Sequence, residues 1–231
     1  MLPIVNAPTY ELKLPSSGKK VKYRPFLVKE QKILLIALQS GDLEAIYNAV
    51  VEITDACTFN KLKVDELPYF DLEHLFINLR SVSIGEILEM QIQCGNCEKT
   101  TPYSLDLTTF SMEGKKVEPF VKITDTIGAQ MRYPTEREMV DVRKKESVED
   151  VYKLVATCIE SIWSGEEEFK ASDAGPDEVM KFLDELTDAQ FKKLEAFFVN
   201  MPKLMHRDEI ECPHCQTKNT IVIEGLHDFF V

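Results

Sequence analysis

Four cysteines are the residues of this chain whose type and spacing most clearly suit chemistry. They form two C-x-x-C motifs, at residues 94–97 and 212–215, and each motif lies between two strand-like runs. Zn²⁺ prefers four tetrahedral ligands, with zinc–sulfur distances of about 2.3 Å, and a C-x-x-C turn supplies two thiolates from one tight loop. The sequence therefore predicts one shared zinc site, with the ligands Cys94, Cys97, Cys212 and Cys215.

The two motifs are unusually far apart for a zinc ribbon. Paired C-x-x-C motifs typically lie roughly 15–20 residues apart, whereas here more than a hundred residues separate them. A folded segment must therefore bring the motifs together. Because four thiolates leave no position for water, we expect a structural metal and not a catalytic one.

Other interpretations of the cysteines stay open. Either pair could be a redox dithiol, although a thioredoxin-type motif opens a helix after a buried strand, and these motifs lie at the tips of predicted hairpins. The pairs could also be unrelated free thiols, or His206 or His214 could replace one thiolate. Cys57 and Cys158 stand alone in helical patterns, and we expect them to be small core residues.

Composition indicates a folded protein whose partners are other proteins. With 231 residues, 44% of them hydrophobic, the chain is long enough for one large domain or two small ones. Its 27 Lys and Arg against 39 Asp and Glu give a net charge of −12, which disfavours nucleic acid and anionic lipid as partners. No run approaches the roughly 18 apolar residues of a membrane span, and the first residues lack a signal-peptide pattern. We therefore expect a cytoplasmic protein without membrane insertion.

The first half of the chain is predicted to hold a hairpin, three helices and a second hairpin. These elements are expected at residues 10–14 with 19–23, then 28–38, 43–57 and 68–84, and finally 87–92 with 103–107. The outer face of the first hairpin is basic, through Lys13, Lys19, Lys20 and Lys22. The first helix is largely apolar after its first turn, and we expect it to be mostly buried.

The second half is expected to repeat this order. Its elements are predicted at residues 120–123 with 130–133, then 135–145, 147–162, from 177 and from 187, and finally about 203–211 with 220–223. Residues 164–176 are expected to form a mobile loop, and Thr187 and Gln190 form a capping box.

The predicted fold is therefore α+β, with two pseudo-repeated halves joined by the shared four-cysteine zinc site. The halves are residues 1–112 and 113–231, and each holds a hairpin, helices and half of a zinc ribbon. The alternative is two unrelated α+β regions that follow a common order of elements.

The chain has no motif of the common catalytic classes. It lacks G-x-G-x-x-G after a strand, G-x-x-x-x-G-K-[ST], G-x-S-x-G and H-E-x-x-H. His74 lies in an amphipathic helix, where a structural role is expected, and no pair of carboxylates stands out among the many acidic residues. We predict no enzymatic activity, no catalytic residues and no small-molecule substrate.

Two stretches carry a family resemblance. Residues 14–38 read LPSSGKKVKYRPFLVKEQKILLIAL, and residues 67–85 read LPYFDLEHLFINLRSVSIG. Both resemble the baseplate hub family of T-even-type contractile-tailed bacteriophages, over about the first hundred residues, and the remainder agrees mainly in length and layout. The resemblance implies a late phage protein that works with other hub and tail proteins to assemble the central hub of the tail baseplate. It supplies no catalytic residue.

Three functions are weighed on these grounds. The first is a non-enzymatic hub subunit or hub assembly factor that acts in the host cytoplasm, with retention in the virion left open. The second is a nucleic-acid-binding or transcription-modulating zinc ribbon, for which only Lys99 and Lys218 supply positive charge close after the motifs. The third is a cell-wall hydrolase of the tail, which rests on acidic residues alone.

Overall fold

The chain begins with the hairpin and helices that its apolar periodicity predicts. In the computed structural model, which describes residues 6–145 and 147–226, these elements are β1 (Tyr10–Lys13), β2 (Lys20–Tyr23), α1 (Val28–Ser40), α2 (Leu43–Cys57), the 3₁₀ turn η1 (Val64–Glu66) and α3 (Tyr69–Ile84). Gly41 ends α1 with a left-handed backbone, at φ 65°. Asp42 then caps α2, since its carboxylate accepts hydrogen bonds from the next N–H groups.

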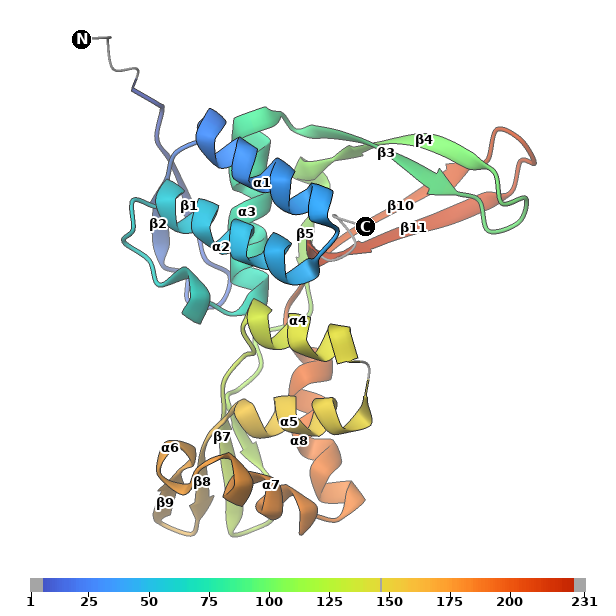
Figure 1. Ribbon diagram of the computed structural model, residues 1–231. Helices are drawn as coiled ribbons and strands as arrows, with labels where there is room; N and C mark the ends of the chain where they lie inside the picture. The colour runs from blue at the N-terminus through green and yellow to red at the C-terminus, as the bar shows by residue number, and fades with distance from the viewer. Residues whose placement is uncertain (1–5, 146, 227–231) are drawn as a thin grey trace. The chain divides into compact units, whose positions relative to one another are not determined.

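Two further hairpins form an arm. The first is β3 (Ile87–Gln93) with β4 (Thr100–Asp106), and the second is β10 (Lys203–Glu211) with β11 (Lys218–Glu224). A 3₁₀ turn, η2 (Leu107–Thr109), leads from β4 to the short strand β5 (Ser111–Glu113), which pairs with β10. Figure 1 shows both hairpins extending in the same direction from the helices α1 to α3.

The chain forms two compact units. Among the described residues, the first comprises residues 6–64, Phe70–Glu113 and residues 203–226; the second comprises Asp65–Tyr69 and, within Gly114–Pro202, the residues that are described. Helices and sheets occur in both units, so the predicted α+β class is confirmed. The predicted boundary at 112/113 lies where the chain leaves the first unit, but the chain returns at Lys203, and the arm is therefore complete within the first unit.

Helices α2 and α3 supply much of the core of the first unit. The predicted apolar faces are buried, with Ile46, Val50, Ile53 and Cys57 on α2 and Leu72, Leu75, Phe76 and Leu79 on α3. Helix α3 also buries Asp71, Glu73 and Arg80, which the apolar pattern does not predict. Each of these charges has a hydrogen-bonding partner within the unit, which offsets the cost of removing it from water.

One prediction for the first unit is wrong. The sequence predicts a mostly buried α1, but Val28 and Ile36 are each 68% exposed and Leu35 is 50% exposed. Helix α1 buries a single narrow side, which includes Leu34 and Ala37. Apolar composition predicts that a helix should be covered, but it does not say by what.

The second unit is a four-stranded antiparallel sheet with helices. The strands, in sheet order, are β6 (Phe120–Lys122), β7 (Ile127–Met131), β8 (Ile159–Ser164) and β9 (Glu167–Lys170). The helices are α4 (Glu136–Lys145), α5 (Val148–Thr157), α6 (Ala171–Ala174), α7 (Pro176–Asp184) and α8 (Asp188–Asn200). The expected capping box of α8 is present, since Gln190 Oε1 accepts from the N–H of Thr187 at 2.8 Å.

Two predictions for the second unit are wrong. The helix expected to reach residue 162 ends at Thr157, and the chain continues as β8, which pairs with β7 and β9. The expected mobile loop at 164–176 instead holds β9 and α6. Gly165 closes the β8–β9 turn with a left-handed backbone at φ 62°, and its N–H donates to the carbonyl of Thr126 at 2.7 Å. Among the described residues, no helix has the length and apolar character needed to cross a membrane.

Candidate metal centre

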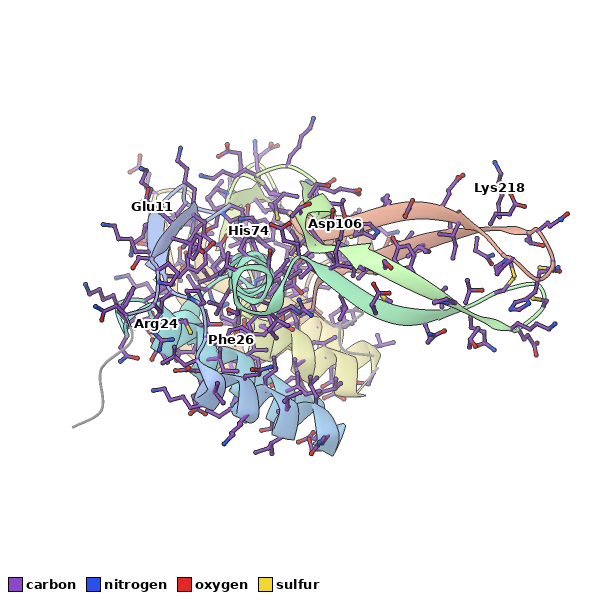
Figure 2. The ribbon with its side chains drawn as sticks, turned by 90° about the horizontal axis from the view of Figure 1, so that it is seen from above. Glu11, Arg24, Phe26, His74, Asp106 and Lys218 are labelled. Carbon is purple, nitrogen blue, oxygen red and sulfur yellow. The ribbon has the colours of Figure 1, made fainter. Side chains whose placement is uncertain are left out.

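Each C-x-x-C motif forms the turn of its hairpin, at the end of the arm where Figure 2 labels Lys218. In the first turn the N–H of Cys94 donates to the carbonyl of Lys99 at 3.0 Å, and the N–H of Glu98 donates to the carbonyl of Cys94 at 2.9 Å. Glu98 has a left-handed backbone, with φ 59°. The turn is closed by its own backbone, and it holds two thiols within one short loop.

The second turn repeats these contacts. The N–H of Cys212 donates to the carbonyl of Thr217 at 2.9 Å, and the N–H of Gln216 donates to the carbonyl of Cys212 at 2.8 Å. Gln216 has φ 60°, which matches the value at the corresponding position of the first turn. Two turns with the same geometry therefore present their thiols in the same way.

Hydrogen bonds join the two turns to each other. The Asn219 side-chain oxygen accepts from the N–H of Gly95 at 3.1 Å. The Asn96 side-chain amide donates to the hydroxyl of Thr217 at 3.1 Å. These contacts bring together motifs that lie more than a hundred residues apart in the sequence.

The four sulfur atoms form one cluster of metal-binding size. The Sγ atoms of Cys94 and Cys215 are 3.7 Å apart, as are those of Cys97 and Cys212, and all four lie within 4.8 Å of one another. Four sulfurs placed tetrahedrally at about 2.3 Å from zinc are about 3.8 Å apart. A disulfide would require about 2.05 Å, and the four cysteines are free thiols. The donor set and its spacing therefore fit a zinc ion.

Hydrogen bonding shifts the pKa values of these thiols in opposite directions. The backbone N–H groups of Cys97 and Asn96 lower the pKa of Cys94. Hydrogen bonds with the side chain and backbone of Thr217 lower the pKa of Cys215 to about 5. The backbone of Lys99 favours the Cys97 thiolate, but burial and hydrogen bonds to the other three thiols raise the pKa of Cys97 to about 11. Crowded thiols cannot all ionise without a cation to compensate their charge.

The two histidines considered as ligands do not join the cluster. Among the described residues, the groups that could share one metal ion here are the four cysteines, and His214 is not one of them. His206 is buried in β10, and both of its ring nitrogens have hydroxyl partners. Its Nε2 lies 2.7 Å from the hydroxyl of Tyr103, and its Nδ1 lies 2.7 Å from the hydroxyl of Thr109.

His206 connects the two hairpins at the base of the arm, which is the end where Figure 2 labels Asp106. The hydroxyl of Tyr103 donates to a carboxylate oxygen of Asp208 at 2.9 Å, so it links this carboxylate to the imidazole of His206. Burial lowers the pKa of His206, and the carboxylates of Asp208 and Asp106 oppose that shift. The two hairpins are thus connected at both ends, by cysteines at the tip and by this network at the base.

The sequence patterns did not reveal a contact at the end of β2. The backbone N–H of Arg24 donates to the carbonyl of Cys57 at 3.1 Å, and its guanidinium donates to Glu30 Oε1 at 3.0 Å. The N–H of Leu27 donates to the other oxygen of Glu30 at 2.7 Å. We call this set of contacts the first arginine clamp. It fixes the turn between the hairpin and α1 and connects that turn to the end of α2.

A second arginine clamp, in the second unit, has the same parts. The N–H of Arg132 donates to the carbonyl of Cys158 at 2.8 Å, and its guanidinium donates to Glu138 Oε1 at 2.6 Å. The N–H of Thr135 donates to the other oxygen of Glu138 at 2.8 Å. The signal in the sequence is an arginine near the end of the first hairpin of each half, with a glutamate six positions later. A cysteine then lies at, or directly after, the end of the second helix that follows.

Comparison with known proteins identifies the family. A family model described as T4 bacteriophage base plate protein matches residues 7–231. The chain belongs to this family. It is similar to the baseplate hub assembly protein gp26 of Enterobacteria phage T4, with 23% identity over 221 residues, which cover 96% of this chain and 97% of that protein. No solved structure matches the chain. The family resemblance of residues 14–38 and 67–85 is therefore confirmed, and the match extends over nearly the whole chain.

Proposed function

We propose that this protein assists the assembly of the central hub of the phage tail baseplate, and that it acts by binding other hub and tail proteins without catalysing a reaction. The observation that carries the proposal is the extent of the match to the T4 hub assembly protein, which covers 96% of this chain and 97% of the relative. A match of this extent includes both units and the arm. Action during assembly places the protein in the host cytoplasm.

The metal in this proposal is a structural Zn²⁺ held by Cys94, Cys97, Cys212 and Cys215. Its support is the spacing of the four sulfur atoms, which lie within 4.8 Å of one another. Bound zinc supplies a closed four-thiolate centre, which joins two hairpins whose cysteines lie more than a hundred residues apart in the sequence. Structural zinc binds small peptides with about 10–16 kcal/mol, far more than a few exposed hydrogen bonds contribute. The arm is then a stiff element that can hold a fixed shape against a partner.

The two halves, residues 1–112 and 113–231, are related by duplication in this proposal. The two hairpins of the arm support it, since they share one register: Gln93 opposes Thr100 as Glu211 opposes Lys218. The two arginine clamps support it independently, because their side chains and backbone groups have matching partners. Duplication explains why one zinc site draws its ligands from motifs so far apart.

The proposal is tested with phage that lack the gene. Such phage should make heads and tail fibres but no complete baseplates, and the full chain supplied from a plasmid should restore them. The double variant Cys212→Ser/Cys215→Ser should fail to restore baseplates, and Cys57→Ser, which lies outside the cluster, should succeed. Complete tails in the absence of the protein would overturn the proposal.

Three further measurements address the open points. The abundance of the protein in purified virions separates a retained hub subunit from a factor that leaves after assembly. Filter binding to DNA and RNA at low salt, and a peptidoglycan digestion assay, test the nucleic-acid-binding and hydrolase alternatives. We expect neither activity, and either one at physiological protein concentration would contradict a role through protein binding alone.

A further inference from the structure

Helix α1 exposes apolar side chains on one side. It pairs with α2 in the first unit, as Figure 1 shows, and it buries Glu30, Leu34 and Ala37. Its other side carries Val28, Leu35 and Ile36, with exposed fractions of 68%, 50% and 68%. A helix that is apolar around most of its circumference is normally covered on more than one side.

These exposed side chains form a continuous stripe. Relative to Val28, residues 32, 35, 36 and 39 follow at the spacings that place side chains on one helix face. The stripe therefore combines the three aliphatic residues with Lys32 and Gln39, and Lys29 lies at its edge. Aliphatic side chains at this spacing are the pattern by which helices recognise a complementary helix or groove.

The same face carries positive charge that no exposed carboxylate of α1 balances. Lys29 and Lys32 are exposed, whereas Glu30, the acidic residue of α1, is only 2% exposed and pairs with both Arg24, at 3.0 Å, and Lys29, at 3.4 Å. The one carboxylate of α1 is thus shared between two cations, which leaves this face with net positive charge. The surrounding sequence has the same bias. In the first forty positions the basic residues are Lys13, Lys19, Lys20, Lys22, Arg24, Lys29 and Lys32, and the acidic residues are Glu11 and Glu30.

This charge pattern decides between possible occupants. A second copy of α1 would bring two more lysines and no carboxylate to the surface, so α1 does not complement itself. An anionic membrane would also be repelled by the rest of a chain whose net charge is −12. A helix whose apolar stripe is bordered by Asp or Glu matches both the aliphatic residues and the lysines.

We propose that the exposed face of α1, formed by Val28, Leu35 and Ile36 with Lys29 and Lys32, docks an acidic amphipathic helix of a hub protein. The identification of the partner as a hub protein rests on the proposed function. The aliphatic stripe supplies the contact that excludes water, and the two lysines set the orientation of the bound helix and speed its association.

The test uses the full chain with a photo-crosslinking amino acid at Ile36, expressed in infected cells that lack the native protein. The matched control carries the same amino acid at Asn48, which is exposed on the neighbouring helix α2. We expect position 36 to crosslink to a hub or tail protein, within a segment that has an apolar helical stripe bordered by Asp or Glu. We expect position 48 to give a yield lower by about ten-fold, and Lys29→Glu/Lys32→Glu to lower the yield at position 36 by about ten-fold at low salt.

Three crosslinking results would overturn the proposal: attachment to another copy of this chain, attachment to lipid, or equal yields from positions 36 and 48. A second variant keeps the proposal separate from the proposed function. Leu35→Gln/Ile36→Gln changes exposed residues only and should keep the helical circular dichroism of the parent, but it should not restore baseplates to phage that lack the gene. If it restores them fully, the docking face is wrong while the role in hub assembly stands; if phage without the gene already build baseplates, the proposed function itself fails.

Discussion

The two arginine clamps use the same contacts in surroundings that differ. In the first unit the Arg24 and Glu30 side chains are 16% and 3% exposed, whereas the Arg132 and Glu138 side chains of the second unit are 33% and 20% exposed. After Cys57, the last residue of the first clamp, the chain continues to the long helix α3 and then to the arm hairpin of β3 and β4. After Cys158, the last residue of the second clamp, the chain continues directly into the strand β8.

The difference shows that the clamp is a local device, independent of the elements that come after it in the chain. In both units it fixes a hairpin, the start of a helix and the end of a later helix, through one ion pair, one backbone hydrogen bond and one hydrogen bond from a backbone N–H to the glutamate. Burial of Glu30 and Glu138 would raise the pKa of each carboxyl, but the arginine hydrogen bonds, the backbone N–H groups of Leu27 and Thr135 and the positive charge of the guanidinium together outweigh it and hold both pKa values below their ordinary range. The deeper clamp should therefore matter more for stability.

The largest expected effect is the loss of the first clamp. Arg24→Met leaves the almost fully buried carboxylate of Glu30 without its guanidinium partner, and we expect it to reduce the free energy of unfolding by about 3–5 kcal/mol. Arg132→Met should cost less, about 1–3 kcal/mol, because water reaches Glu138 more easily. Hydrogen exchange measured by mass spectrometry reports the two units separately.

A double variant controls for lost packing at the first clamp. Arg24→Met/Glu30→Leu removes the buried carboxylate as well as the guanidinium, and it should recover part of the stability lost in the single variant. The comparison fails if Arg24→Met lowers the free energy of unfolding by no more than Arg132→Met does. It also fails if the loss in the double variant equals the sum of the losses in the two single variants.

The arm offers the next comparison, because its two hairpins share one register but carry different residues at the position of His206. His206 opposes Ile223 in the second hairpin, and the corresponding position of the first is Leu88, which opposes Leu105. We expect His206→Leu to cost about 1–2 kcal/mol at neutral pH, because it removes buried hydrogen bonds.

The pH dependence of the same variant gives a second readout. Burial lowers the folded-state pKa of His206 below its ordinary value of 6.5. As the pH falls through 6.5, the unfolded chain therefore takes up a proton before the folded chain does, and the free energy of unfolding decreases. His206→Leu should flatten this slope in urea unfolding between about pH 7 and pH 5. An unchanged slope would show that protonation of His206 does not contribute to the pH dependence of stability.

The two buried cysteines outside the cluster, Cys57 and Cys158, give a further comparison. Burial raises the pKa of Cys57 to about 11 and that of Cys158 to about 12, so both remain thiols at neutral pH. Cys158→Ser places a hydroxyl in an apolar core, and we expect a loss of about 1–3 kcal/mol. Cys57→Ser should cost less, because the guanidinium of Arg24 lies 3.4 Å from that sulfur and can bond the hydroxyl. Zinc content should be unchanged in both variants, and loss of zinc from either would contradict the assigned ligands.

The first hairpins of the two halves differ in pairing and in charge: β1 and β2 form a two-stranded sheet, whereas β6 and β7 belong to a four-stranded one. The difference in charge gives the smallest expected effect on stability. Lys13, Lys19, Lys20 and Lys22 are exposed on β1 and β2, and Lys20 pairs with Glu11 at 2.8 Å. Lys20→Glu/Lys22→Glu should leave stability nearly unchanged, because exposed charges contribute little to it. It should weaken association with a hub partner in a salt-dependent way, measured by pull-down at two salt concentrations. If the same partners are recovered at the same salt concentration, the hairpin is not part of the docking surface.

The sequence predicted those elements whose residue pattern suits only one type of secondary structure. Alternation around a turn defined the hairpins, and the i, i+3, i+4 spacing of Ile46, Val50 and Ile53 fixed the buried side of α2. The prediction failed where a residue pattern suits both a helix and a strand. The apolar residues at 158, 159 and 162 suit a helical stripe and also a buried strand, and only pairing with β7 and β9 decides between them.

The sequence predicted the cysteines of the candidate site, but it did not predict the contacts that hold the two turns together. Cysteine spacing alone identified the two turns, since few other residue patterns place two thiols in one loop. The contacts between the turns, through Asn96 and Asn219, depend on tertiary pairing that no local pattern reports. The clamps were missed for a similar reason, because an arginine and a glutamate near a helix start are common on protein surfaces, and their burial is a property of the folded unit.

The central claim is that one metal ion joins the two halves at the tip of the arm, and zinc analysis of the freshly purified, unchelated full chain tests it most directly. We expect one zinc per chain, four sulfur ligands at about 2.3 Å by X-ray absorption, and no zinc in Cys212→Ser/Cys215→Ser. Protein that contains no zinc, or a double variant that retains it, would contradict the account.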